Sequence, residues 1–248
     1  MLSTVRSGAG RTAAIALVGV LLAAGCGSPQ STNESPSGEA ADAEPVQVGL
    51  VYSQSGPLQA YGEQYIAGFE AGLDFATDGT GEVDGRPIEV TERDDTGDPA
   101  KAVSEATDLI GQGYQILAGS TSSGVALQVA PLAEQNEVLF ISGPAATDGI
   151  TGINDYTFRS GRQTYQDVLT SASFIGDPAG QTVLVFAQDN AFGQANVAAV
   201  TAVLGGAGAT VEPLLVPETA TDITTFRRRP HRVPLISSSS PGPVRRPA

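Results

Sequence analysis

Short apolar segments with strand character alternate with segments of helical periodicity along most of this 248-residue chain. Strands are predicted at residues 46–52, 87–92, 115–118, 138–142, 156–159, 182–187 and 210–216. Helices are predicted at about 61–73, 99–111, 125–136, 163–175 and 194–204. Such alternation predicts an α/β fold whose parallel sheets are covered by helices on both faces. A break near residues 150–154 divides the pattern into two lobes.

One strand-to-helix junction, AGSTSSGVALQV at residues 118–129, is typical of an anion-binding site. Four hydroxylated residues lie in it: Ser120, Thr121, Ser122 and Ser123. Gly124 allows backbone N–H groups to approach a ligand closely. In open α/β sheets, ligands bind outside the carboxyl ends of the strands, where helix N-termini converge. We interpret this junction as a carboxylate or phosphate site. The alternative is that Ser122 or Ser123 only caps a helix.

Four further residues are predicted at the same edge of the sheet, each after a strand: Tyr61, Ala145, Thr147 and Phe192. An aromatic residue in such a position is more often part of the core, so packing is the alternative role for Tyr61 and Phe192. Four loops nevertheless reach the same edge, and together they favour a ligand pocket more strongly than any one of these residues does alone.

Composition excludes several classes of function. The net charge of −14 argues against nucleic-acid binding, which needs a basic surface. With one cysteine and one histidine, an intrachain disulfide and a Cys/His metal site are impossible. The histidine, His231, lies in an anomalous tail, so an extracellular hydrolase built on a histidine base is disfavoured. The acidic run at residues 94–98 lacks calcium-loop spacing and is expected to serve helix capping and solvation. We expect no metal, cofactor or catalytic residue.

The amino terminus is predicted to be an export signal. Arg6 and Arg11 precede an apolar run from Ala13 to Ala24, which is too short for a membrane span. The sequence LLAAGC resembles a bacterial lipoprotein signal, which implies that Cys26 is lipidated. An ordinary signal peptide cut near Gly25 is the alternative. Residues 27–45 are rich in Ser, Pro, Glu and Ala and are predicted to form a disordered tether.

Residues 227–248 differ sharply from the rest of the chain. They contain six of the 13 basic residues and none of the 27 acidic ones, so residues 1–226 carry seven basic residues and a net charge of −20. The segment shows no helical or strand periodicity. We interpret it as the product of a frameshift. A disordered basic arm for an acidic partner is the alternative.

The ordered series of motifs resembles the branched-chain amino-acid (Leu/Ile/Val) binding proteins, which are the type I periplasmic solute-binding proteins of ABC importers. The motifs are VQVGLVY, SGPLQAYG, DDTGDPAKAV, STSSGVALQVAPLAEQ, SGPAATD, YTFRS and QDNAFGQ. The resemblance spans about residues 46–226. It implies a two-lobed type I periplasmic-binding-protein fold and binding of an amino acid without chemical change.

The resemblance also implies roles for the residues at the predicted edge. Ser123 and Thr147 would hold the α-carboxylate of the ligand, and the Ala145 carbonyl with the Thr147 hydroxyl would accept from the α-ammonium. Tyr61 would wall the side-chain pocket. Phe192 stands where the family often has tyrosine, in the second lobe.

The predicted organisation is a signal with the lipidated cysteine (1–26), a tether (27–45), a first lobe (46–150), a partial second lobe (151–226) and an out-of-frame tail (227–248). We expect an extracytoplasmic monomer that is lipid-anchored to the cell membrane and serves ABC permease subunits. Because half of the pocket would be missing, we expect weak ligand binding. The alternative is a sensory domain for amides or amino acids.

Overall fold

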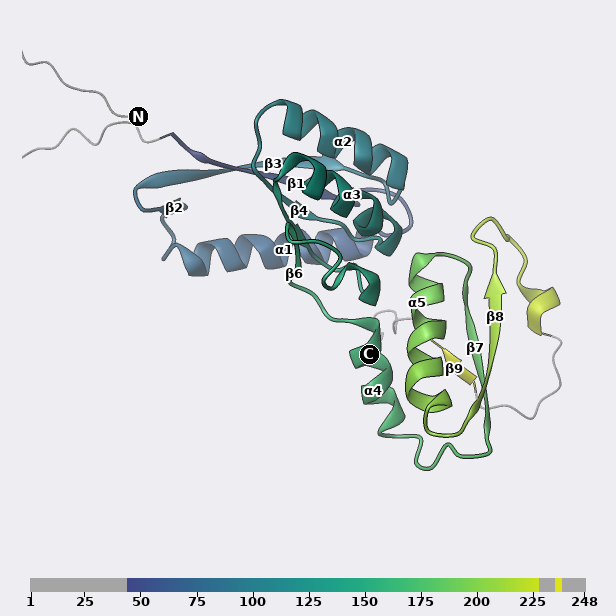
Figure 1. The fold of residues 1–248 in the computed structure, drawn as a ribbon. Coiled ribbons are helices and arrows are strands. Elements are labelled where there is room, and N and C mark those ends of the chain that lie inside the picture. Colours follow the sequence, from purple (N-terminus) through teal and green to yellow (C-terminus); the bar gives the residue numbers. More distant parts are fainter. Residues whose placement is uncertain (1–43, 228–234, 238–248) are drawn as a thin grey trace, which may run out of the picture. The chain divides into compact units, whose positions relative to one another are not determined.

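The computed structural model describes residues 44–227 and 235–237, which form two groups of elements (Figure 1). The predicted signal peptide, Cys26, most of the predicted tether and most of the tail lie outside these residues. Within the described part, no helix is both long and apolar enough to cross a membrane.

The first group is built on a six-stranded sheet with strand order β2-β3-β1-β4-β5-β6. Its strands are β1 (Val46–Tyr52), β2 (Glu82–Val83), β3 (Arg86–Asp94), β4 (Ile116–Gly119), β5 (Leu139–Ser142) and β6 (Thr157–Arg159). Every neighbouring pair is parallel except β2–β3. The prediction of a mainly parallel sheet is therefore confirmed.

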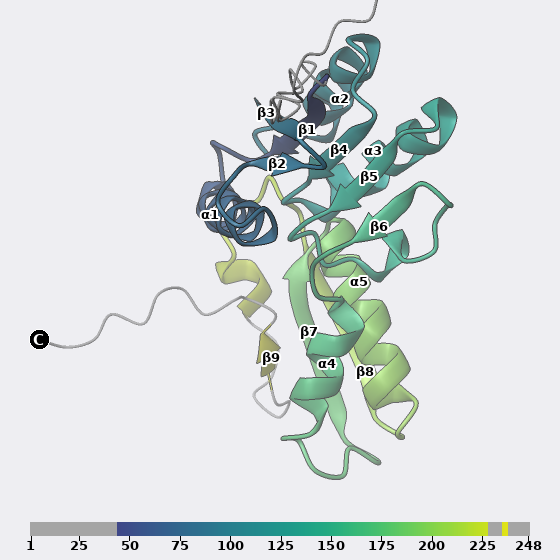
Figure 2. The same ribbon diagram turned by 90° about the vertical axis from the view of Figure 1, so that its left-hand side faces the viewer.

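Helices lie on both faces of this sheet, as expected from its strands, which are apolar on both sides. The helices are α1 (Gln59–Ala76), α2 (Pro99–Gly111) and α3 (Ser123–Asn136). Val51, Leu117 and Phe140 point to the face covered by α2 and α3. Leu50 and Ala118 point to the opposite face, which is covered by α1. Figure 2 shows α1 on one side of the strands and α2 and α3 on the other.

The face covered by α1 is only partly filled. A groove of about 580 Å³ runs between α1 and strands β4 and β5. Its lining includes Gly68 and Gly72 of α1, Ala118 of β4 and Ile141 of β5. A Cβ atom added at either glycine would meet nothing within 4 Å. The groove therefore leaves apolar sheet surface open to water.

The second group has a three-stranded parallel sheet with strand order β8-β7-β9. Its elements are α4 (Thr164–Ala172), β7 (Thr182–Gln188), α5 (Ala191–Val200), a π-helical turn (Thr201–Gly205), β8 (Thr210–Val216) and β9 (Leu235–Ser237). Val168 of α4 packs with Val183 and Val185 of β7 and with Ala199 and Val200 of α5. This group therefore has a hydrophobic core of its own.

The structure differs from the prediction at two places, and each difference has a local cause. Residues 79–85, for which no strand or helix was predicted, contain β2, which turns into β3 through Asp84 and Gly85 with φ of 51° and 74°. An Asp-Gly pair is typical of such a two-residue hairpin. The helix predicted from residue 194 begins at Ala191, because the Asn190 side chain accepts from the N–H of Gly193 at 2.9 Å and caps it.

The tail contains one strand that we did not expect. Leu235–Ser237 form β9, which pairs in parallel with β7 from Leu184 to Phe186. The prediction that residues 227–248 contain no regular structure is therefore wrong for these three residues. A run of three apolar and small residues can pair with an open strand edge even without longer periodicity.

Candidate ligand-binding site

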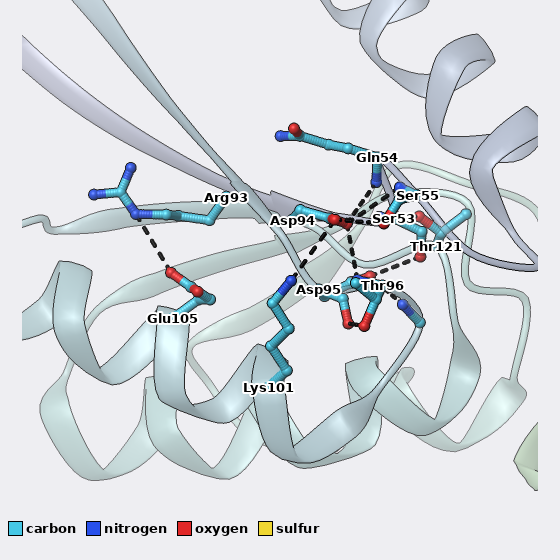
Figure 3. A network of polar contacts seen from close by, with 11 residues as sticks. Ser53, Gln54, Ser55, Arg93, Asp94, Asp95, Thr96, Lys101, Glu105 and Thr121 are labelled. Atoms are coloured by element: carbon cyan, nitrogen blue, oxygen red, sulfur yellow. Dashed lines mark hydrogen bonds and ion pairs between the residues drawn. The ribbon is translucent and has the colours of Figure 1, made fainter.

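The carboxyl ends of β1, β3 and β4 are joined by a buried polar network (Figure 3). Asp95 is completely buried, and its Oδ1 accepts from the Ser53 hydroxyl and from the N–H of Gly97, both at 2.7 Å. The N–H of Ser53 in turn donates to Thr121 Oγ1 at 3.0 Å. These hydrogen bonds link three loops to one another, so the loops at this edge of the sheet are held in a defined arrangement.

Asp94 organises the loop that precedes α1. Its carboxylate accepts from the N–H groups of Gln54 and Thr96 at 2.9 and 2.8 Å and from the Ser55 hydroxyl at 2.6 Å, and it lies 3.7 Å from the Lys101 ammonium. Partial burial alone would raise the pKa of Asp94, but these partners together lower it to about 2. Asp94 is therefore a structural anion.

The expectation for the acidic run is half confirmed. Asp98 caps α2 by accepting from the N–H groups of Ala100 and Lys101 at 2.7 and 3.0 Å. Asp95 was expected to be solvated but is buried. This could not be predicted, because the sequence does not show that Ser53 and Gly97 donate hydrogen bonds to it. Among the described residues, no cluster of His, Cys, Asp and Glu could hold a metal ion.

Three of the predicted site residues come together beside the N-terminus of α3. The N–H of Thr147 donates to the Ser123 hydroxyl at 3.3 Å, and the N–H of Ala145 donates to the Ser120 carbonyl at 3.2 Å. All three predicted residues are at least 96% buried. The Thr147 hydroxyl also accepts from the N–H of Gly149 at 3.3 Å, which caps the short 3-10 helix Asp148–Ile150. We call Ser122, Ser123, Ala145 and Thr147 the candidate anion site.

The serine at the N-cap of α3 does not use its side chain for capping. Ser122 occupies the N-cap position, but its hydroxyl makes no capping hydrogen bond. The turn before it is tight: Gly119 and Ser120 have φ of 122° and 62°, and a Cβ at Gly119 would lie 2.2 Å from the Val51 carbonyl. The helix N-terminus is thus held at the sheet edge without a side-chain cap, an arrangement suited to an external anion.

Tyr61 and Phe192 are less closely tied to the candidate anion site. Tyr61 lies in the first turn of α1 and is 39% exposed. Phe192 was expected in a loop but lies half-buried in the first turn of α5, where its carbonyl accepts from Asn196 Nδ2 at 2.8 Å. In the described part of the chain, neither ring stacks on another aromatic ring. Their roles as pocket walls remain predictions.

Sequence reasoning did not single out two residues that contact the loop of the candidate anion site. Arg159, at the end of β6, donates to the carbonyl of Thr147. Thr164, at the start of α4, donates to the carbonyl of Ala146 from both its N–H and its hydroxyl, at 2.8 Å each. Arg159 stands inside the motif YTFRS, but no pattern of spacing indicates which carbonyl an arginine reaches.

Comparison with known proteins places this arrangement in a family. The sequence model described as periplasmic binding protein matches residues 45–231. The chain belongs to the periplasmic binding protein family. The resemblance drawn from the motifs and the predicted fold class are therefore confirmed.

Curated relatives within the periplasmic binding protein family include two Leu/Ile/Val-binding proteins. BraC3 of Rhizobium johnstonii is 26% identical over 167 residues, which are 66% of this chain and 45% of BraC3. Leu/Ile/Val-binding protein homolog 6 of Brucella abortus is 28% identical over 198 residues, which are 79% of this chain and 50% of the relative. The chain therefore spans about half the length of these relatives.

Solved structures of periplasmic binding proteins are similar over the same part. An ABC-type branched-chain amino acid transporter protein from Rhodopseudomonas palustris is 36% identical with a TM-score of 0.60, over 79% of this chain and 56% of that one. A solute-binding protein from the same organism, solved with 4-hydroxybenzoate, is 26% identical with a TM-score of 0.64, over 74% of this chain and 50% of that one. Both named ligand classes carry a carboxylate.

Proposed function

We propose that this chain is an extracytoplasmic solute-binding protein of an ABC importer and that its ligand is a free branched-chain amino acid or a similar small carboxylate. One observation carries the proposal: the Ser123 hydroxyl and the Thr147 N–H lie 3.3 Å apart at the uncapped N-terminus of α3. Membership of the family and the named relatives support it.

The geometry suits capture of a carboxylate. An N-terminal helix dipole and unpaired first-turn N–H groups favour a negative group there. Ser122 and Ser123 can donate their hydroxyl protons to it, because Ser122 makes no capping bond and Ser123 uses its oxygen as an acceptor. The Ala145 carbonyl can accept from an ammonium group. Tyr61 and Phe192 would contact the ligand's side chain from two elements. No bond is made or broken, so no enzymatic activity is proposed.

The same proposal includes the location and the partners. An export signal with Cys26 as the lipidated residue would hold the folded part outside the cytoplasmic membrane, where family members act, and would present it to permease subunits. Lipid anchoring rests on the sequence LLAAGC and lies outside the described residues.

We further propose that binding by this chain is impaired. The candidate anion site, with Tyr61 and Phe192, includes no carboxylate that could pair with the ligand's ammonium group. Loss of one partner of a buried charge costs about 2–5 kcal/mol, or about thirty-fold to several-thousand-fold in affinity.

An NMR titration of the ¹⁵N-labelled chain with leucine and with 4-hydroxybenzoate tests this proposal. We expect millimolar or weaker dissociation constants and shifts at the Ser123 and Thr147 amides. Ser123→Ala should weaken binding about ten-fold, the value of one hydrogen bond to a charged group. Ser104→Ala, an exposed serine on α2, is the matched control and should bind as the wild type does. Micromolar leucine binding would refute impairment, and no response to either carboxylate would refute the function.

A further inference from the structure

The loop between β5 and β6 is held from two sides. On one side, Ala145 and Thr147 donate to Ser120 and Ser123 and thereby face α3. On the other side, the loop accepts hydrogen bonds from the last residue of β6 and the first residue of α4. The second set of bonds has no role in the proposed function described so far, although it reaches the residues of the candidate anion site.

Thr164 determines the orientation of the peptide that carries the Thr147 N–H. The N–H and the hydroxyl of Thr164, which is fully buried, both donate to the Ala146 carbonyl at 2.8 Å. This carbonyl and the Thr147 N–H belong to the same peptide group, and in a trans peptide they point in opposite directions. Holding the carbonyl toward α4 therefore directs the Thr147 N–H toward Ser123.

Arg159 holds the next peptide. Its Nη2 donates to the Thr147 carbonyl, and its Nη1 donates to the Arg162 carbonyl at 2.6 Å. The side chain forms no ion pair among the described residues, and its buried Nε–H has no hydrogen-bond partner there. Burial lowers the pKa of Arg159, whereas the negative charge of Asp148 opposes this. Without an ion-pair partner, the desolvation of this half-buried guanidinium is offset only by the hydrogen bonds that it donates to carbonyl groups. We therefore interpret Arg159 as a residue that holds these carbonyl groups in place.

We propose that Arg159 and Thr164 are positioning residues that fix the peptides on both sides of Thr147 and so hold the Thr147 N–H against the Ser123 hydroxyl, which the ligand's carboxylate would contact. The inference rests on the proposed function. Thr147 adopts φ of −54° and ψ of 133°, and these two angles relate the two held peptides. We call Arg159 and Thr164 the clamp. Thr164 is also the first residue of α4, whose Val168 packs in the hydrophobic core of the second group of elements, so the clamp connects the candidate anion site to that group.

Four variants test the proposal in the full chain by the NMR titration with leucine. Thr164→Val keeps the shape and removes the hydroxyl bond, so affinity should fall about two- to ten-fold, while Thr164→Ser should stay within about two-fold. Arg159→Met should lower affinity about ten- to hundred-fold, and Arg159→Lys should recover part of it, since a charged donor remains. Arg162→Met is the matched control, because the clamp uses only the Arg162 carbonyl, and it should bind as the wild type does.

Hydrogen exchange without ligand separates this proposal from the proposed function. If the clamp orients the Thr147 peptide, Thr164→Val and Arg159→Met should speed exchange of the Thr147 amide and leave the β1 amides unchanged. That result in a chain that binds neither carboxylate would retain the clamp and reject the function. Unchanged Thr147 exchange and unchanged affinity in both variants would overturn the clamp, as would equal speeding of exchange throughout the first sheet.

Discussion

Asp94 and Asp95 are adjacent in the sequence, and their surroundings move their pKa values in opposite directions. Asp94 is bonded to N–H and hydroxyl donors and to Lys101, which favours its charged form. Asp95 is completely buried, and burial raises its pKa although Ser53 and Gly97 partly oppose this; its Oδ2 has no partner among the described residues. Neighbouring carboxyl groups should therefore give opposite dependences of stability on pH.

For Asp95, the unfolded chain loses its proton at a lower pH than the folded chain does. Stability of the wild type should therefore fall as pH rises from the ordinary aspartate range through the raised pKa. Asp95→Asn removes this loss, so the variant should gain stability relative to the wild type between about pH 4 and about pH 7. Urea unfolding of the variant and the wild type at these two pH values measures the difference in stability. A difference that does not change with pH would contradict a raised pKa for Asp95.

Asp94→Asn is the matched control for that experiment, because its effect has the opposite sign. The lowered pKa of Asp94, about 2 against 3.8 for the free group, means that its stabilisation is present above the ordinary range and is lost as pH falls. The variant should be less stable than the wild type at neutral pH, and it should approach the wild type in acid.

At the scale of elements, the same strand-to-helix joint is used in both groups. A Cβ added at Gly62 of α1 would lie 1.8 Å from the Ser53 carbonyl after β1, and one added at Gly193 of α5 would lie 1.8 Å from the Gln188 carbonyl at the end of β7. In each case the helix passes so close to the strand end that only glycine fits. The joint sets the position of the helix N-terminus at the sheet edge.

Gly62→Ala and Gly193→Ala should each destabilise the chain by about 1–3 kcal/mol, the cost of overpacking, because the obstructing atom is backbone. Gly68→Ala is the matched control on the same helix, where a Cβ meets nothing within 4 Å. It should be neutral or stabilise by up to about 1 kcal/mol, since alanine favours helix. Urea midpoints measure all three, and equal losses at Gly62 and Gly68 would show that close approach is not the cause.

The sequence predicts elements whose signals are local. Asp98 and Pro99 locate the start of α2 within one residue, and the alternation of apolar segments with helical segments predicts that the first sheet is mainly parallel. The clamp on Thr147 and the partners of Asp95 could not be predicted, because they depend on side chains that meet across loops from different strands. Ser123 and Thr147 were predicted because both follow strands that end at one edge and because the family resemblance gives both a binding role.

At the scale of the whole molecule, three aromatic rings of the described chain are exposed. Phe75 and Phe174 are each 86% exposed and Phe158 is 57% exposed, and the groove beside α1 leaves sheet surface open. Large exposed apolar surface on a soluble domain marks a site where another surface packs.

The frameshift hypothesis is tested by translating the gene's other two frames beyond the codon for Phe226. We expect one of them to encode acidic residues and to continue the strand and helix alternation, because composition changes abruptly at Arg227. A chain repaired in that frame should also bind leucine more tightly than this one. If neither frame yields an α/β continuation, the basic tail is genuine and the hypothesis is wrong.

The open groove beside α1 has a consequence for the amount of protein in a cell. Chaperones and proteases act on apolar surface that water reaches, and a stability loss of about 1–2 kcal/mol can already change abundance several-fold. The amount of folded polypeptide, and not only its affinity for a ligand, would then limit the function proposed for this chain.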